Sequence, residues 1–317
     1  MSAIAAIAVV SWNTRDLLER CLRSLTPETD AGVLEVWVVD NASTDGSADL
    51  VRNEFPWVNL VASDENLGFG RAVNLVASRT ATPWLGIANA DIRLHAGAIR
   101  ELLAAAERDP GAGALAPRLV LPDGTTQHSV FAFPSPRVAL AVAAGAARRP
   151  RVGDRLLLPG AWDATRERRV PWAVAAFLLV RREAWEAAGG FDEDQWMYAE
   201  DLDLGWRLAR AGYPTRYVPG AVADHEHEAS TSQAWGGERA LRWQRNSYAW
   251  MLRRRGWVLT RTIAGIEFAN ATVRWAGAAA LARIRSGSWP RRRDRWRWWM
   301  RMHRTGLERA SALRERR

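Results

Sequence analysis

The 317-residue sequence contains no lysine and a single cysteine, so all 44 of its Lys-plus-Arg positions are arginine. One cysteine, Cys21, excludes an internal disulfide and a cluster of thiolate metal ligands. No apolar run reaches the roughly 20 residues that a membrane-spanning helix needs; the nearest, residues 138–147, stops at Arg148. The apolar N-terminus lacks the basic segment of a signal peptide, which predicts a buried first strand and a cytoplasmic protein.

Positive charge is distributed unevenly along the chain. The net charge is +9, yet residues 238–317 hold 21 arginines and five acidic residues, so the rest of the chain is mildly acidic. A hydrophobic content of 48% is sufficient for a globular core. We therefore expect a globular domain over residues 1–237 and a basic helical extension over residues 238–317.

Short apolar runs rich in β-branched residues alternate with segments of helical spacing in the first 90 residues. The expected strands are residues 4–10, 33–39, 57–62 and 84–88, and the expected helices are residues 14–25, 47–55 and 70–79. Strands that alternate with helices predict right-handed crossovers and a mainly parallel sheet covered on both faces. The expected fold class is α/β.

Polar residues follow each of these four apolar runs. They are residues 11–13, "DNASTDGS" at 40–47, "SDENLGFGRAVN" at 63–74 and "NADIRL" at 89–94. Each could be an ordinary turn, but ligands of such sheets bind beyond the carboxyl ends of the strands, so four in succession favour a binding site. "GFGRAV" does not complete a dinucleotide-binding motif, because Val73 stands where the third glycine would be.

Six motifs in order resemble family 2 glycosyltransferases, and more narrowly the bacterial rhamnosyltransferase-like branch, which glycosylates lipid-linked cell-surface precursors. They are "VVSWNTRDLLERCLRSL", "VWVVDNASTDGS", "NLGFGRAVN", "NADIRL", "GGFDEDQWMYAEDLDLGWRLARAGY" and "VADHEHEAS". The resemblance covers about residues 4–232. It implies a GT-A fold with a Rossmann-like central sheet, a nucleotide-diphosphate sugar donor, a divalent cation and inversion at the anomeric carbon.

The resemblance assigns the donor nucleotide to the ends of the first three expected strands. Asp40 would accept the imide N–H of uracil or thymine, and Trp12 would stack on that base. Asn66 and Arg71 would reach the base or the phosphates, although Arg71 stands where the family has a small residue.

A metal site is implied at the fourth strand. Asp91 matches the last position of the family's D-x-D signature, whose first position here is Asn89, so both are candidates for the donor site. One carboxylate together with diphosphate oxygens and water suits Mg²⁺ or Mn²⁺. His225 matches a family histidine that completes the site and favours Mn²⁺; the alternatives are a structural role for His225 and a ligand role for His227.

Three carboxylates, Glu200, Asp201 and Asp203, open a helix that the leucine spacing predicts up to Gly212. The helix dipole alone would favour acids there. The resemblance makes Asp201, the second residue of the family's E-D pair, the general base, and we expect the helix N-terminus to keep it ionised. Glu200 would orient the acceptor or the loop, and Asp203 would fix the turn through an arginine such as Arg207.

Residues just upstream of this helix are candidates for contacts with the donor or acceptor sugar. Gly190 offers close approach to the backbone, Asp192 is a polar contact, and Trp196 would form an apolar wall.

The basic extension interleaves arginine with tryptophan in residues 242–257 and 288–306. This combination is typical of membrane-surface helices and predicts contact with anionic lipid at the inner face of the plasma membrane. Nucleic-acid binding is the rival interpretation, which we do not expect because no nucleic-acid module accompanies the extension. A third is a helical hairpin that mediates homodimer contacts.

The function expected from the whole sequence is a metal-dependent inverting glycosyltransferase that uses dTDP-rhamnose and a lipid-linked or surface-glycan acceptor. One alternative is a transferase of the same fold that uses a UDP-hexose. Another is a non-catalytic nucleotide-sugar-binding protein whose tail binds membrane or nucleic acid.

Overall fold

The computed structural model describes residues 3–195, 198–226, 239–284 and 288–308. The chain divides into two compact units. The sheet unit comprises residues 1–133 and 163–236, and the helical unit comprises residues 134–162 and 237–317.

The sheet unit is built on one mixed sheet, with nine strands among the described residues in the order β3-β2-β1-β4-β10-β6-β11-β5 and β8 beside β11. The strands are β1 Ala5–Ser11, β2 Leu34–Asn41, β3 Asn59–Ser63, β4 Trp84–Asn89, β5 Ile92–Leu94, β6 Ala114–Val120, β8 Arg168–Val170, β10 Phe177–Arg181 and β11 Thr215–His225. A small second sheet pairs β7 (Val130–Phe131) with β9 (Trp172–Ala173).

Six strands, β3, β2, β1, β4, β6 and β11, run in the same direction, and β5, β8 and β10 run against them. The expectation of a mainly parallel sheet is confirmed. The first four expected strands and the three expected helices are present, with ends shifted by no more than five residues.

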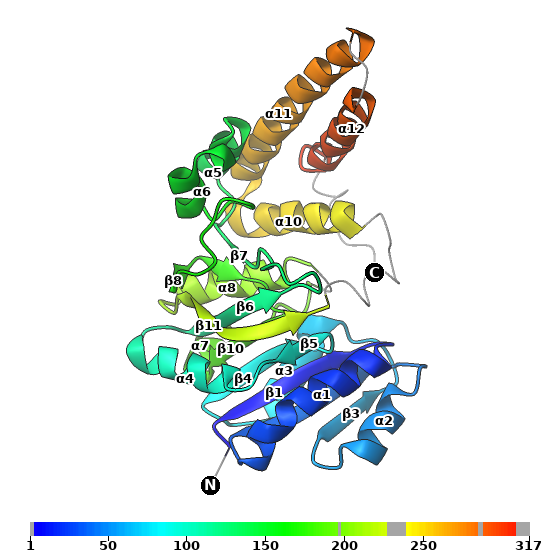
Figure 1. Ribbon diagram of the computed structural model, residues 1–317, viewed down its shortest axis with the longest axis vertical. Helices are drawn as coiled ribbons and strands as arrows, with labels where there is room; N and C mark the ends of the chain where they lie inside the picture. Colours follow the sequence, from blue (N-terminus) through cyan, green and yellow to red (C-terminus); the bar gives the residue numbers. More distant parts are fainter. Residues whose placement is uncertain (1–2, 196–197, 227–238, 285–287, 309–317) are drawn as a thin grey trace. The chain divides into compact units, whose positions relative to one another are not determined.

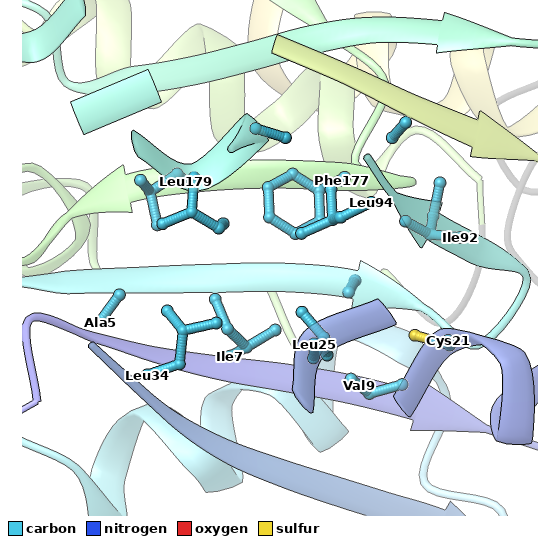
Figure 2. Close-up of a cluster of buried hydrophobic side chains, with 14 of the residues drawn as sticks. Ala5, Ile7, Val9, Cys21, Leu25, Leu34, Ile92, Leu94, Phe177 and Leu179 are labelled. Atoms are coloured by element: carbon cyan, nitrogen blue, oxygen red, sulfur yellow. The ribbon is translucent and has the colours of Figure 1, made fainter. Parts of the chain in front are cut away.

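Helices cover both faces of the sheet (Figure 1). They are α1 Arg15–Asp30, α2 Ser47–Glu54, α3 Phe69–Arg79, α4 Ala98–Arg108, α7 Arg182–Ala188 and α8 Glu200–Arg210. Apolar residues of α1, α2 and α4 form one buried cluster with alternate side chains of the strands, and Figure 2 shows part of it around Ile7, Leu25 and Phe177. On the other face α3 contacts β1 and β2, and α7 contacts β4 and β10.

The helical unit contains six helical segments among the described residues. They are α5 Pro136–Ala143, η1 Ala146–Arg148, α6 Pro150–Arg155, α10 Arg239–Arg255, α11 Trp257–Ile284 and α12 Trp289–Thr305. None of the helices within the described ranges combines the length and the apolar character needed to cross a bilayer.

Residues 134–162 pack with the C-terminal helices rather than with the sheet, which no local pattern in the sequence indicated. In the structure α5 contacts α11. Arg274 Nη2 donates to the Ala143 carbonyl at 3.2 Å, and Arg255 Nη1 donates to the Pro134 carbonyl at 3.4 Å. The segment is inserted between β7 and β8, and a long-range helix–helix contact of this kind has no local sequence signature.

A partly buried ion-pair cluster joins the loop before β6 to β8 and β11. Asp109, 7% exposed, accepts from Arg169 Nε at 2.9 Å and from Arg216 Nη1 at 2.8 Å, and Arg216 Nε also donates to Glu167 at 2.8 Å. The Arg169 and Arg216 guanidinium groups lower the pKa of the Asp109 carboxyl to about 2.

We expect Asp109→Asn to lower the free energy of unfolding at pH 7 by about 2 kcal/mol, because it removes the charge that two arginines share. The folded-state pKa lies below the unfolded value, so the contribution is complete above about pH 4 and is lost as the pH falls through 2. Urea unfolding of both proteins between pH 3 and 7 measures it. Asp16→Asn, at an exposed acid beside Arg15, is the control and should change nothing measurable; equal effects of both substitutions would contradict the expectation.

Candidate active site

The polar ends of the first parallel strands meet on one edge of the sheet. In the strand register Ser11 pairs with Asp40, Asn41 pairs with Ser63, and Val10 pairs with Asn89. The polar residues that follow these strands in the sequence predicted a binding site at this edge.

Hydrogen bonds join the loops after β1 and β2. The Asn13 N–H donates to Ser43 Oγ at 2.9 Å, and the Thr44 N–H donates to Asn13 Oδ1 at 2.8 Å. Asp40 is 3% exposed; its Oδ2 accepts from the Ser43 N–H at 3.2 Å, while its Oδ1 has no hydrogen-bond partner among the described residues. Trp12, in the adjoining loop, is partly buried. Asp40 thus presents a buried oxygen that can accept a hydrogen bond from a ligand.

Backbone strain is concentrated on loops that carry candidate residues. Among the described non-glycine residues a positive φ occurs at Asn13, Ala42, Tyr198 and Ala199 in the sheet unit, with values between 52° and 67°. The first two adjoin Trp12 and Asp40, and the last two immediately precede α8. Such conformations cost about 1–3 kcal/mol each and persist where the surrounding structure imposes them, often at functional sites.

Asp91 and His225 lie side by side although 134 positions separate them in the sequence. Asp91 is in the turn between β4 and β5, and His225 ends β11, whose pairing with β5 places it opposite Ile92. The Glu226 N–H donates to the Asp91 carbonyl at 3.1 Å and closes this junction. His225 Nε2 is 3.3 Å from Asp91 Oδ1, and the two side chains are 5% and 9% exposed.

This pair fits a divalent cation in both geometry and donor chemistry. Asp91 Oδ1 is buried and accepts no hydrogen bond from the described residues. A carboxylate oxygen and an imidazole nitrogen together suit Mn²⁺ better than Mg²⁺. No group of three or more His, Cys, Asp or Glu side chains with metal-binding geometry occurs within the described ranges, so the remaining ligands would come from substrate and water.

A pocket of about 460 Å³ opens at this pair. Asp91, His225 and Asp224 line it together with Arg20 and Arg93. Arg20 Nη2 is 2.7 Å from Glu226 Oε1, and Arg93 is paired with Asp224. Asp40 and Asp201 are not part of the pocket lining.

Helix α3 ties the donor-side loop to residues 190–193. The Asn74 carboxamide donates to the Phe191 carbonyl at 3.0 Å and accepts from the Phe191 N–H at 2.9 Å. Arg71 Nε lies 3.8 Å from Glu193 Oε2, so this arginine already has a carboxylate beside it. Asn66 Oδ1 accepts from the Gly68 N–H at 2.9 Å and shapes its own loop.

The space beside Gly190 is occupied by protein. A Cβ at this position would lie 2.8 Å from Asn74 Oδ1 and 3.1 Å from the Trp185 ring, and φ is +66°. Asp192 Oδ1 accepts from the Asp194 N–H at 3.1 Å. Packing and backbone conformation therefore explain why residue 190 is glycine. The expected close approach of a sugar is not needed as an explanation.

Asp201, in the first turn of α8, is held by backbone N–H groups. Its Oδ1 accepts from the Leu202 N–H at 2.8 Å, and the Ala175 N–H also donates to the carboxylate. Burial outweighs these donors and raises the pKa of the Asp201 carboxyl to about 6. A carboxyl with this pKa is still mostly ionised at pH 7 and can take up a proton, and the backbone donors at the helix N-terminus favour the ionised form against burial.

A short backbone segment, residues 175–176, connects Asp201 with the end of β4 by hydrogen bonds. The Ala175 N–H donates to Asp201, and the carbonyl of the next residue, Ala176, accepts from the Asn89 N–H at 2.9 Å. Two residues of chain therefore separate the Asp201 carboxylate from the strand end that leads to Asp91.

Asp203 has the structural role that its spacing predicted. It is fully buried, and Arg207 Nε donates to its Oδ2 at 2.7 Å. Arg207 also donates to the Ala188 carbonyl, so the pair attaches α8 to the end of α7. Glu200 is partly buried in the same first turn. Trp196 and His227 lie outside the described residues.

Gln127, which follows the turn after β6, was not among the residues predicted from the sequence. Gln127 is 8% exposed, and its Oε1 is 2.7 Å from His225 Nδ1. A glutamine in a hairpin gives no sequence signal for this contact.

Comparisons with known proteins find matching family models, relatives and solved structures. The model of the family "Glycosyl transferase family 2" matches residues 6–131, and that of "Glycosyl transferase family group 2" matches residues 154–305. An N-acetylglucosaminyl-diphospho-decaprenol L-rhamnosyltransferase of Mycobacterium tuberculosis is 35% identical over 257 residues, which cover 74% of this chain and 79% of the relative.

A shorter match is to rhamnosyltransferase WbbL of Escherichia coli, 33% identical over 87 residues, or 27% of this chain and 32% of that protein. Among solved structures, the mannosyltransferase PcManGT of Pyrobaculum calidifontis, in complex with GDP-Man and Mn²⁺, aligns with a TM-score of 0.59 and 22% identity. The alignment covers 99% of this chain and 87% of that one, and at this identity it shows the fold, GT-A.

We expect Asp201→Asn to raise the melting temperature at pH 8, because it removes a partly buried charge whose desolvation is unfavourable. The folded-state pKa of about 6 exceeds the unfolded value, so the ionised carboxylate reduces stability progressively as the pH rises through 6. Thermal unfolding at pH 5 and pH 8 should show a gain that is larger at pH 8. Asp203→Asn, two positions along the same turn, is the matched control and should lower the melting temperature because Arg207 loses its partner. A similar loss in both variants would contradict the expectation.

Proposed function

Since the chain belongs to glycosyltransferase family 2, in its rhamnosyltransferase branch, we propose that it transfers L-rhamnose from dTDP-rhamnose to a hydroxyl of a lipid-linked sugar. The observation that carries the proposal is the 35% identity to an L-rhamnosyltransferase over 79% of that relative. Its printed acceptor is a sugar on a decaprenyl diphosphate, and we propose an acceptor of the same class.

Asp40 is the contact for the nucleotide base. Its buried Oδ1 faces no donor among the described residues, so it can accept the imide N–H of thymine or uracil. Trp12, in the next loop, is available to stack on the base. This assignment does not separate dTDP from UDP, because both bases carry the same imide.

Asp91 and His225 are the proposed ligands of Mn²⁺ or Mg²⁺, at the pocket where the donor diphosphate would lie. A cation bound there would neutralise charge on the departing nucleoside diphosphate. Asn89 ends β4, two residues before Asp91, and is a further candidate residue of the donor site.

Asp201 is the proposed general base. The acceptor hydroxyl oxygen bonds to the anomeric carbon from the face opposite the diphosphate, the bond from that carbon to the diphosphate oxygen breaks, and the hydroxyl proton passes to Asp201. A pKa near 6 suits this role, because the group is mostly ionised at neutral pH and is more basic than an ordinary aspartate. Glu200, in the same turn, would orient the acceptor.

The helical unit is the proposed contact with an anionic membrane at the inner face of the plasma membrane. Nine of the ten exposed large apolar side chains among the described residues belong to it: Leu140, Val142, Val152, Trp243, Trp257, Val258, Val273, Ile284 and Leu307. Arginines lie against tryptophans in the same helices, as at Trp257 with Arg261 and Trp289 with Arg292. Exposed apolar groups beside cations suit anionic head groups.

Replacing Asp201 with Asn should lower kcat by about 10²–10⁴-fold, while nucleotide binding persists, because only proton transfer is removed. The measurement is rhamnose transfer from dTDP-rhamnose to a short-chain polyprenyl-diphosphate sugar with Mn²⁺ present. In the native protein kcat/KM should fall on the acidic side with an apparent pKa near 6. UDP-hexoses serve as the comparison donors.

Unchanged turnover in Asp201→Asn would contradict the role of the base. Turnover with a UDP-hexose and none with dTDP-rhamnose would contradict the donor. Nucleotide binding without transfer from any donor would favour the non-catalytic alternative.

Binding to vesicles that contain 30% phosphatidylglycerol should weaken by about 2 kcal/mol when Arg291 and Arg292 are replaced with Gln, since each basic residue near an anionic surface contributes about 1 kcal/mol. Co-sedimentation of the full chain at 0.1 M salt measures it, and 0.5 M salt should abolish most binding. The matched control replaces Arg79 and Arg100, exposed arginines of the sheet unit, and should bind as the native protein does. Equal binding to neutral vesicles, or preference for DNA at the same salt, would contradict the membrane assignment.

A further inference from the structure

We propose that Gln127 is a positioning residue that selects the tautomer of His225 and thereby tunes the affinity of the site for a divalent cation. The inference rests on the proposed function only in taking Asp91 and His225 as the metal ligands. It assigns a role to the turn after β6, for which neither the sequence nor the comparisons provide one.

The geometry places the amide directly behind the imidazole. Gln127 Oε1 is 2.7 Å from His225 Nδ1, whereas His225 Nε2, on the opposite side of the ring, is 3.3 Å from Asp91 Oδ1. Gln127 and His225 are 8% and 4% exposed, so water competes little for this contact.

Backbone hydrogen bonds fix the position of Gln127. Its N–H donates to the Leu119 carbonyl at 2.9 Å, and the neighbouring residue, Thr126, forms a bridge with Val120. Val120 is also the register partner of Asp224 on β11. Gln127 and His225 are thus each next to a residue paired with the same position of β6, and the sheet itself brings them together.

A neutral imidazole carries one N–H, and the hydrogen bond at one ring nitrogen decides which nitrogen keeps its lone pair. An amide oxygen at Nδ1 accepts the Nδ1–H and leaves the Nε2 lone pair directed to Asp91, where a cation would bind. Without that acceptor, the Asp91 carboxylate favours a proton on Nε2, which blocks metal ligation there. Gln127 therefore opposes the tendency of Asp91 to draw the imidazole proton to Nε2.

The choice of an amide, rather than a carboxylate, has its own consequence. A neutral acceptor fixes the tautomer without adding negative charge, so the two side-chain ligands together bring a charge of only −1 to the cation. Such a site depends on the diphosphate for further ligands. Glutamate at this position would accept the same hydrogen bond and would make the imidazole a stronger ligand.

The first measurement is Mn²⁺ binding to the full-length protein without nucleotide sugar, followed by the electron paramagnetic resonance signal of free Mn²⁺. Gln127→Met, which keeps the length of the side chain but cannot accept the hydrogen bond, should weaken Mn²⁺ binding by about 10–100-fold. Gln127→Glu should bind Mn²⁺ at least as tightly as the native protein. Gln244→Met replaces a buried glutamine of the helical unit and should leave Mn²⁺ binding unchanged.

The second measurement is the ¹⁵N spectrum of histidine in the metal-free protein, with His225→Ala used to assign the signal. His225 should carry its proton on Nδ1 in the native protein and in Gln127→Glu, and on Nε2 in Gln127→Met. A purely structural role for Gln127 would lower stability without moving the proton. The amide can also rotate to donate its NH₂ to Nδ1, so a native protein with the proton on Nε2 would overturn the inference.

Native Mn²⁺ affinity in Gln127→Met would overturn it as well. If Gln127→Met fails to fold, the ¹⁵N spectrum of the native protein and the Mn²⁺ affinity of Gln127→Glu still test the inference. Neither readout requires a sugar donor. Failure of rhamnose transfer with an intact dependence of Mn²⁺ binding on Gln127 would therefore reject the proposed function and leave this inference standing.

Discussion

The pairing of β5 with the end of β11 is the contact on which the rest of the site depends. It places His225 opposite Ile92, and the hydrogen bond from the Glu226 N–H to the Asp91 carbonyl then fixes the turn that carries Asp91. Asp91 is the residue before Ile92, so this junction brings Asp91 Oδ1 to 3.3 Å from His225 Nε2. A buried carboxylate oxygen without a hydrogen-bond donor costs free energy, and the cation proposed here would be a partner for Asp91 Oδ1.

An arginine partner separates two acidic residues of α8 into distinct roles. Asp203 and Asp201 are two positions apart on α8, yet Asp203 is neutralised by Arg207, whereas the donors to Asp201 among the described residues are backbone N–H groups and its pKa is raised. The same helix N-terminus acts on both. The presence or absence of an arginine, and not the helix dipole, therefore determines which carboxylate supports the fold and which remains able to accept a proton.

The sequence was sufficient for features that depend on local patterns. Apolar runs predicted β1 to β4, polar residues at their ends predicted the edge where the site lies, and leucine spacing predicted α8 and its pair of Asp203 with Arg207. Features that depend on distant contacts had no such signal. Four such features join segments that are far apart in the chain. They are the reversed strand β10, the packing of residues 134–162 against α11, the hydrogen bonds of Asn74 with Phe191, and the contact of Gln127 with His225.

Charge around the pocket indicates why a transferase with this arrangement would need a cation. Arg20 and Arg93 line the pocket and Arg71 is a candidate residue of the donor site; each already has a carboxylate within 4.0 Å, namely Glu226, Asp224 and Glu193, respectively. Asp91 adds a negative charge on the same wall. If the donor diphosphate enters here, as proposed, it meets paired arginines and the Asp91 carboxylate, and the cation proposed at Asp91 and His225 would supply the positive charge that the paired arginines do not. In the proposed function this cation would be the positive end of the donor site, and the groups that orient its ligands would then act on donor binding.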